Sequence, residues 1–300
     1  SSTIKLSPEF QKRIEKIISS EKIELKENFK IYWEEFPIAK LLPSKDYLKP
    51  EFNLIVDDMI ELPEQKKLQF FLENWIKKRI NLILKSLIDL KNSKESKSNI
   101  RALSYQLYEN NGVVKRENVI DYVNKLNQVE RKNLRNIGVK FGRYHVYLYK
   151  LLKPEAVSLR LILWKNYHQK YFDFKPPKFG LNFLESKKLL NKNFMLICGF
   201  EKFDNFFVRI DILERLFIQI INSDRKQNRE ILLVPEMLNL LGCSKENFIK
   251  LIKKMNYKSI EKENKIYIKY LPFKNKNYKN VVKKNNENSP FNVLKELSIK

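Results

Sequence analysis

The sequence is poor in glycine, cysteine and histidine, and each shortage argues against a class of site. Only 6 of its 300 residues are glycine, far below the roughly 7% of ordinary proteins, and no Gly-x-x-x-x-Gly-Lys phosphate loop is present. Cys198 and Cys243 form no Cys-x-x-Cys pair, and His145 and His168 have no cysteine or carboxylate at ligand spacing. The sequence therefore predicts no disulfide, no metal site, no cofactor and no catalytic residue within this chain.

Long apolar runs are also missing. No run approaches the roughly 18 residues that a membrane span requires, and the first residues lack the apolar core of a signal peptide. Together with the two unpaired cysteines, these features predict a cytoplasmic protein with no membrane partner. Because the chain does not begin with methionine, we expect a processed product or an excised piece of a longer protein.

Positive charge, in contrast, is abundant and unevenly placed. The chain has 59 Lys and Arg against 35 Asp and Glu, a net charge of +24. Residues 1–62 carry −2, residues 63–170 carry +14 and residues 171–300 carry +12. A drift toward AT-rich codons would raise Lys throughout, whereas a local excess is the pattern expected for binding a phosphate backbone. The placement of the charge thus favours a nucleic-acid partner.

Hydrophobic periodicity predicts a mainly helical α+β chain with small β elements. The expected parts are a mixed cap at 1–62, a helical domain at 63–170, a linker at 171–193, a second domain at 194–271 and a basic flexible tail with a short terminal helix at 272–300. Within the second domain, two strands are expected over 194–210, a helix capped by Asp211, a helix opened by Pro235, a helix capped by Ser244 and two final strands. That order predicts a winged-helix domain.

An alternating, aromatic and basic segment from Val139 to Tyr149 predicts a β-hairpin that turns at Gly142 and Arg143. Cations neutralise phosphates and aromatic rings stack on any base, so the segment suits sequence-tolerant binding of a single strand. The other basic candidates lie on the third helix and last strand of the winged-helix domain. The full set of candidate nucleic-acid contacts is Lys140, Arg143, Tyr144, Tyr147, Lys150, Lys153, Lys250, Lys253, Lys254, Lys265 and Lys269.

Four blocks of the sequence resemble a known family in the same order. The clearest is residues 134–148, Leu-Arg-Asn-Ile-Gly-Val-Lys-Phe-Gly-Arg-Tyr-His-Val-Tyr-Leu, followed by Leu-Leu-Lys-Pro at 151–154. The others are residues 31–41, residues 208–216 with 240–244, and Ser-Pro-Phe at 289–291. Together they resemble the accessory region that follows the ATPase core in bacterial helicases related to the mitochondrial degradosome RNA helicase. Tyr149 and Lys150 depart from the family pattern, which has a proline and a small residue there.

The resemblance implies that this chain is the non-catalytic C-terminal part of an ATP-dependent RNA helicase and forms part of its single-strand RNA channel. ATP and Mg²⁺ would bind the RecA-like core domains of the parent enzyme. The implied partners are those core domains, single-stranded RNA or DNA, and an exoribonuclease.

Two other functions fit the same sequence. Winged-helix replication initiators and transcription regulators place their third helix in the DNA major groove, although this helix offers lysines and no arginine for reading guanine. A protein-interaction scaffold is the third possibility. A sequence-specific footprint on duplex DNA would favour the regulator, and tight binding of single-stranded RNA would favour the helicase part.

The missing phosphate loop gives a first prediction. The purified chain should release no phosphate from Mg-ATP, and its thermal unfolding temperature should not change when Mg-ATP is added, because nothing in it would cradle the β- and γ-phosphates. Phosphate release and thermal unfolding measure the two effects. ATP turnover that a substitution in this chain abolishes would contradict the prediction.

Overall fold

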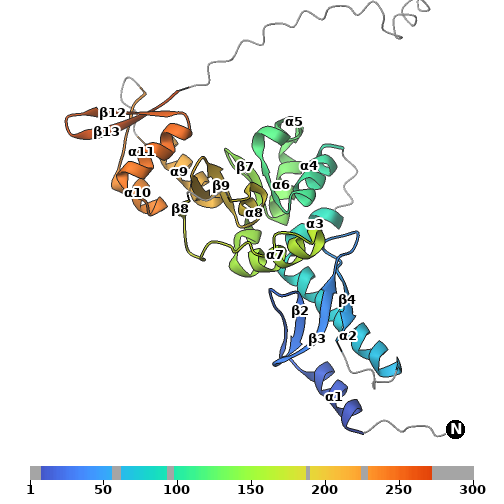
Figure 1. The fold of residues 1–300 in the computed structure, drawn as a ribbon. Helices are drawn as coiled ribbons and strands as arrows, with labels where there is room; N and C mark the ends of the chain where they lie inside the picture. The colour runs from blue at the N-terminus through green and yellow to red at the C-terminus, as the bar shows by residue number, and fades with distance from the viewer. Residues whose placement is uncertain (1–7, 56–61, 93–97, 187–189, 224–228, 272–300) are drawn as a thin grey trace, which may run out of the picture.

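The computed structural model describes residues 8–55, 62–92, 98–186, 190–223 and 229–271 of the chain. Helices predominate and the strands form small antiparallel sheets, which confirms the expected α+β class. The N-terminal elements, the central helices and the C-terminal elements follow one another along an elongated molecule (Figure 1). The tail expected at 272–300 lies outside the described residues.

The N-terminal elements are a helix and a four-stranded sheet in the order β1-β2-β3-β4. Their bounds are α1 Pro8–Ser19, β1 Ile23–Leu25, β2 Lys30–Trp33, β3 Phe36–Leu42 and β4 Glu51–Leu54. The expected helical domain begins with α2, Leu62–Ile83, and a break at Leu84 separates it from α3, Lys85–Asn92. Four residues of α2 spaced four apart are buried on one face, as the periodicity predicts: Leu68, Leu72, Ile76 and Ile80.

The central part contains short helices around a three-stranded sheet in the order β5-β7-β6. Its elements are α4 Ser98–Glu109, β5 Val113–Lys115, η1 Arg116–Val119, α5 Ile120–Lys125, α6 Gln128–Ile137, β6 Val139–Phe141, β7 His145–Leu148, η2 Tyr149–Leu152 and α7 Pro154–His168. Local chemistry sets several bounds: Asn127 and Glu130 form a capping box before α6, and Gly138 ends that helix in the left-handed region. The β6–β7 hairpin is present as expected.

One hydrophobic cluster joins the first two expected parts. It extends from Ile17 through the N-terminal sheet and the central helices to Leu163 in α7. The boundary at residues 62 and 63 therefore does not separate two hydrophobic cores. A second cluster lies between residues 206 and 268, and Tyr144 of the central hairpin packs against it.

The C-terminal elements differ from expectation at their start. They are β8 Phe183–Glu185, α8 Lys192–Ile197, β9 Phe200–Phe203, β10 Phe206–Arg209, α9 Ile210–Asn222, β11 Ile231–Leu232, α10 Pro235–Leu241, α11 Lys245–Lys254, β12 Tyr257–Lys262 and β13 Lys265–Tyr270. Residues expected to begin a strand at Phe194 belong to helix α8, and part of the expected linker is strand β8, which pairs with β10. Asp211 does not cap α9, because the helix begins at Ile210 and the Asp211 carboxylate pairs with Arg209 at 2.6 Å.

A fully buried arginine fixes the central helices to α8. The guanidinium of Arg160 donates to the backbone carbonyls of Asn111 at 2.8 Å, Leu151 at 2.5 Å and Ile197 at 3.0 Å. These carbonyls lie at or just beyond the C-terminal ends of α4, η2 and α8, where helix dipoles concentrate negative charge. Burial nevertheless lowers the pKa of Arg160 to about 10, since no carboxylate is bonded to its charge among the described residues.

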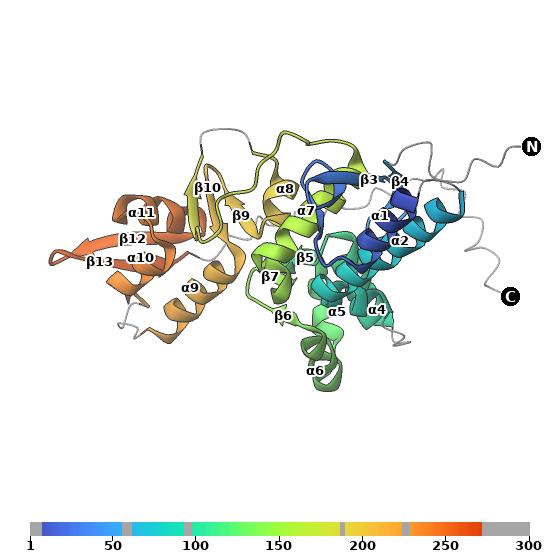
Figure 2. The same cartoon turned by 90° about the horizontal axis from the view of Figure 1, so that it is seen from below.

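A buried glutamate joins the hairpin to α9. The Glu214 carboxylate accepts backbone N–H bonds from Arg143 at 2.5 Å, Tyr144 at 2.8 Å and His145 at 3.2 Å. These bonds offset the cost of burying a charge that is 8% exposed. A Cβ at position 142 would overlap the carboxylate, so a larger residue there would displace Glu214 from these bonds. The turn between β6 and β7 is thereby held against α9 (Figure 2).

The glutamate contact gives a second prediction. Glu214→Ala should lower the free energy of unfolding by about 2 kcal/mol or more, because it leaves buried N–H donors without an acceptor. Urea unfolding followed by circular dichroism measures the change. Glu73→Ala, on the exposed face of α2, is the control and should stay within about 0.5 kcal/mol of wild type. Equal stability of the two variants would show that the contact contributes little.

Candidate nucleic-acid interface

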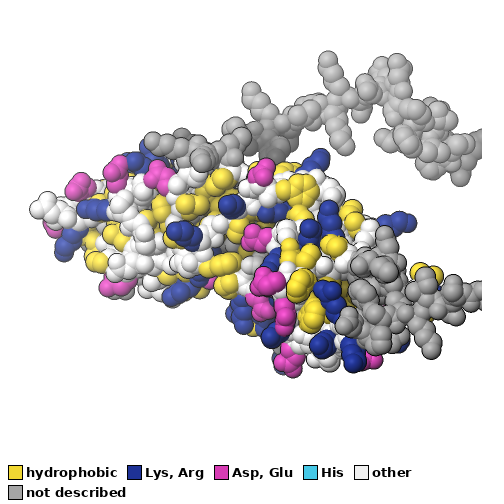
Figure 3. Space-filling model, turned by 60° about the horizontal axis from the view of Figure 1, so that its bottom comes forward, with side chains coloured by type: hydrophobic (Ala, Val, Ile, Leu, Met, Phe, Trp, Pro, Cys, Tyr) yellow, Lys and Arg dark blue, Asp and Glu magenta, His cyan; other side chains and the backbone are white. Residues whose placement is uncertain are grey.

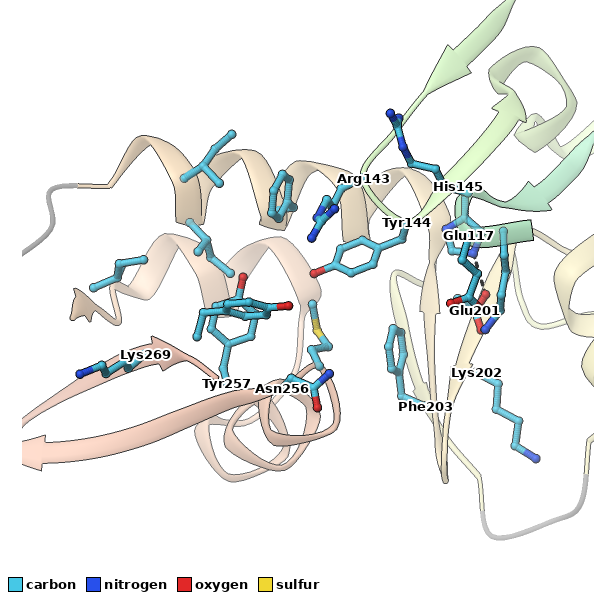
Figure 4. Close-up of a pocket in the computed structure, with 18 of the residues that line it drawn as sticks. Glu117, Arg143, Tyr144, His145, Glu201, Lys202, Phe203, Asn256, Tyr257 and Lys269 are labelled. Atoms are coloured by element: carbon cyan, nitrogen blue, oxygen red, sulfur yellow. Dashed lines mark hydrogen bonds and ion pairs between the residues drawn. The ribbon is translucent and has the colours of Figure 1, made fainter. Parts of the chain in front are cut away.

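A large cleft lies where the hairpin turn meets the C-terminal elements. Its volume is about 1240 Å³, above the roughly 300–1,000 Å³ of pockets for small molecules, so it has room for an extended ligand. Residues from η1 and the β6–β7 turn line one side, and residues from β9, α9 and the β12–β13 hairpin line the other. Figure 4 shows Arg143 and Tyr144 facing Tyr257 and Asn256 across the opening.

Cations outnumber acids along this cleft. The basic lining residues are Lys115, Arg116, Arg143, Lys202, Arg229 and Lys269. The acidic ones are Glu117, which is exposed, and Glu201, which is buried in an ion pair. Burial lowers the pKa of Arg116, and the positive charges of Arg131 and Arg143 lower it further. An anion bound beside Arg116 and Arg143 would relieve this repulsion.

Aromatic side chains also line the cleft: Tyr144, Phe203, Phe217, Tyr257 and Tyr270. Tyr144 packs edge-on against Phe217 at a centroid distance of 5.9 Å, and Tyr257 against Tyr270 at 5.3 Å. Burial and the neighbouring Tyr257 raise the pKa of Tyr144, so its hydroxyl stays protonated. Tyr270 is 42% exposed, which leaves part of its ring accessible to a base.

A buried ionic network supports the hairpin beneath the cleft. His145 Nε2 lies 2.6 Å from the Glu201 carboxylate, and Lys115 Nζ lies 3.1 Å from its second oxygen. Burial raises the pKa of Glu201, but the hydrogen bond and charge of His145, with the charge of Lys115, outweigh it and hold the pKa below 4.5. Because an ionised carboxylate only accepts hydrogen bonds, His145 donates from Nε2. The network ties β5 and β7 to β9.

Among the candidate residues of the hairpin, the basic side chains are accessible to solvent and the tyrosine rings are partly or fully buried. Lys140, Arg143, Lys150 and Lys153 are all exposed. Tyr147, however, is only 6% exposed and packs with Val113 and Ile210, so its expected role in stacking on bases is not supported. Tyr144 is half-buried, with its ring against the second hydrophobic cluster.

The C-terminal candidates do not form one surface with the hairpin. Lys269 lines the cleft, whereas Lys253 and Lys265 are exposed outside it. On α11, Lys250 pairs with Glu246 at 2.5 Å and Lys254 with Asp204 at 2.8 Å. The structure therefore places Arg143 and Lys269 along the same cleft, while the α11 lysines do not line it.

Sequence reasoning missed four of the six cations that line the cleft. Lys115, Arg116, Lys202 and Arg229 line the cleft but were not among the candidates. The adjacent pair Lys115-Arg116 gave a weak signal, while Lys202 and Arg229 become neighbours of the hairpin only through folding. Cys243, which precedes a helix, is no reactive thiolate, because burial raises its pKa to about 11.

Among the described residues, no group of three or more His, Cys, Asp or Glu side chains is placed to hold a metal ion. In the same part of the chain, none of the helices combines the length and apolar character needed to cross a membrane. No protein-family model matches the sequence, and neither a curated protein nor a solved structure matches the chain.

The buried network predicts how stability depends on acid. The folded pKa of Glu201 lies below its ordinary value of 4.5, so its contribution to stability is present above that pH and is lost as the pH falls through the folded pKa. Glu201→Gln should therefore be less stable than wild type at pH 7, and the difference should shrink toward pH 3. Urea midpoints across this range measure it. The control is Glu117→Gln, at an exposed position in the same cleft, and its stability should equal that of wild type at every pH. If Glu201→Gln also had wild-type stability at every pH, the network would contribute nothing.

Proposed function

We propose that this chain binds single-stranded RNA through the cleft between the β6–β7 turn and the C-terminal elements. The observation that carries the proposal is the lining of the cleft, where six cations face two acids and five aromatic rings lie among them. Cations along a groove with interspersed aromatic rings are the usual means of holding a single strand without reading its sequence. On the face in Figure 3, Lys and Arg are otherwise scattered among hydrophobic side chains.

We further propose that the chain is the non-catalytic C-terminal part of an ATP-dependent RNA helicase. This rests on the resemblance of its sequence blocks, two of which meet at the Glu214 contact: residues 134–148 supply the N–H donors and residues 208–216 supply the carboxylate. RecA-like core domains that bind ATP and Mg²⁺, and an exoribonuclease, are partners that the resemblance alone supports.

The C-terminal elements support a winged-helix assignment. Helices α9, α10 and α11 are followed by the β12–β13 hairpin, and β11 pairs with β13 as the third strand. In a DNA-binding regulator of this class α11 would enter the major groove. Against that role, Asn247 bonds to Glu185 at 3.2 Å and Lys254 pairs with Asp204. These contacts turn polar groups of α11 toward the β8–β10 sheet, so we place RNA binding in the cleft instead.

The cleft and α11 can be separated by experiment. Removing three cleft cations with Arg143→Ala, Lys202→Ala and Lys269→Ala should lower the slope of log affinity against log salt by about 2, at about 0.7 for each lost phosphate contact. Fluorescence anisotropy of a labelled single-stranded RNA measures the slope. The matched control removes the same charge from α11 through Lys250→Ala, Lys253→Ala and Lys254→Ala and should change the slope less.

Two results would contradict the proposal. Equal slopes for the cleft and α11 variants would show that RNA binding depends on the total charge of the protein and not on the cleft. Sequence-dependent loss of duplex DNA binding in the α11 variant, with the cleft variant unaffected, would favour the DNA-binding regulator.

A further inference from the structure

A second, smaller cleft adjoins the first at the hairpin turn. Its volume is about 520 Å³, and Arg143 and Phe217 line both clefts. Its other walls come from β6, the start of η2 and the outer face of α9. Arg143 and Phe217 therefore border both clefts, so a strand in the first cleft would have to pass Arg143 to reach the second.

The available charge of the second cleft is positive. Its acids are Asp211 and Glu214, of which Asp211 is bonded to Arg209 and Glu214 to the backbone of the turn. Its cations are Lys140, Arg143 and Arg215, all exposed and without an ion pair to the described residues. A negatively charged ligand suits this site, and a phosphodiester continuing from the first cleft supplies that charge.

Tyr149 gives the second cleft an exposed aromatic ring. The residue is 42% exposed, in contrast to Tyr147, because β7 ends at Leu148 and η2 turns the chain at Tyr149. Lys140 Nζ lies over the Tyr149 ring, 5.2 Å from its centre, so a base would stack on the opposite face of the ring or take the place of the ammonium. A base on the ring and its phosphate near Lys140 would satisfy both groups.

We propose that the second cleft is a base-stacking subsite for the same single-stranded nucleic acid, with Tyr149 as its platform, Lys140 and Arg215 as its phosphate contacts and Arg143 as the crossing point. The inference rests on the proposed function and deepens it, because it extends the path of the strand beyond the main cleft. It also gives a role to Tyr149, one of two residues that depart from the helicase pattern.

Strand length provides the test. Oligouridylates of about 4 and about 12 nucleotides cover the usual range of site sizes for single-strand binding folds. In anisotropy titrations of the full chain, Tyr149→Ala should weaken binding of the longer strand about tenfold, the size expected for one lost stacking contact. It should leave the shorter strand, held in the main cleft, within about twofold. Tyr149→Phe should bind both strands like wild type, because the ring remains.

Control variants keep the result interpretable. Tyr105→Ala removes a ring that is 60% exposed and lines neither cleft, and it should change neither affinity. A tryptophan placed by Tyr149→Trp should lose fluorescence with the longer strand, measured as the difference from wild type; the same substitution at Tyr105 should not.

The remaining outcomes separate the two proposals. Unchanged affinity of Tyr149→Ala for the longer strand, while wild type binds it, would overturn the subsite and leave the proposed function standing. Equal losses for both strands would overturn the continuous path. A wild-type chain that binds neither strand would overturn both.

Discussion

The contact of Glu214 with three consecutive backbone N–H groups is the constraint on which the candidate interface depends. The main cleft has one wall on the central hairpin and the other on the C-terminal elements, so its width is fixed only if the two are held together. A buried carboxylate holds the two parts together strongly, and the three converging N–H donors also fix its position and orientation. Gly142 is the sequence requirement, because any side chain there would displace the carboxylate.

The same contact decides which groups remain for an external anion. Backbone N–H groups in a turn form a concave site that attracts phosphates, but here Glu214 already fills it. The positive charge left at the turn is therefore that of the side chains, and Arg143 lies over the Phe217 ring at 5.8 Å. Long arginine side chains can adjust their position to the phosphates of a flexible strand. The site that results suits a backbone with many phosphates better than a single anion held by main-chain geometry.

Local sequence signals predicted local structure well. Pro235 opens α10, Ser244 caps α11, and the β6–β7 hairpin turns at Gly142 and Arg143 as expected. The errors are of two kinds. A strand is expected from Phe194, yet Asn191 caps a helix there. The linker was read from its prolines and glycine, although Phe183–Glu185 pairs with β10, a contact that local sequence does not reveal.

The site was harder to predict, because each of its features depends on contacts between distant residues. Alternating side chains along a strand do not reveal which face another part of the chain covers. From the sequence alone, Tyr147 and Tyr149 therefore look equivalent, whereas in the structure β7 ends at the residue between them. Charge has the same ambiguity. Arg160 is basic but is consumed by buried carbonyls, and Lys254 is paired, whereas Arg143 remains available. A net charge counts all three equally, although the buried Arg160 cannot reach a phosphate backbone and the exposed Arg143 can.

The different surroundings of the basic residues also bear on why the chain has so much positive charge. A codon bias toward lysine would add cations wherever the surface tolerates them, and the scattered lysines are consistent with that. It would not place Arg116 in a partly buried cleft where burial, and then the charges of Arg131 and Arg143, lower its pKa while the buried acid is already paired. Repulsion between like charges in a partly buried site destabilises the free protein. A bound anion would offset that cost, which is the physical argument for reading this cleft as a binding site.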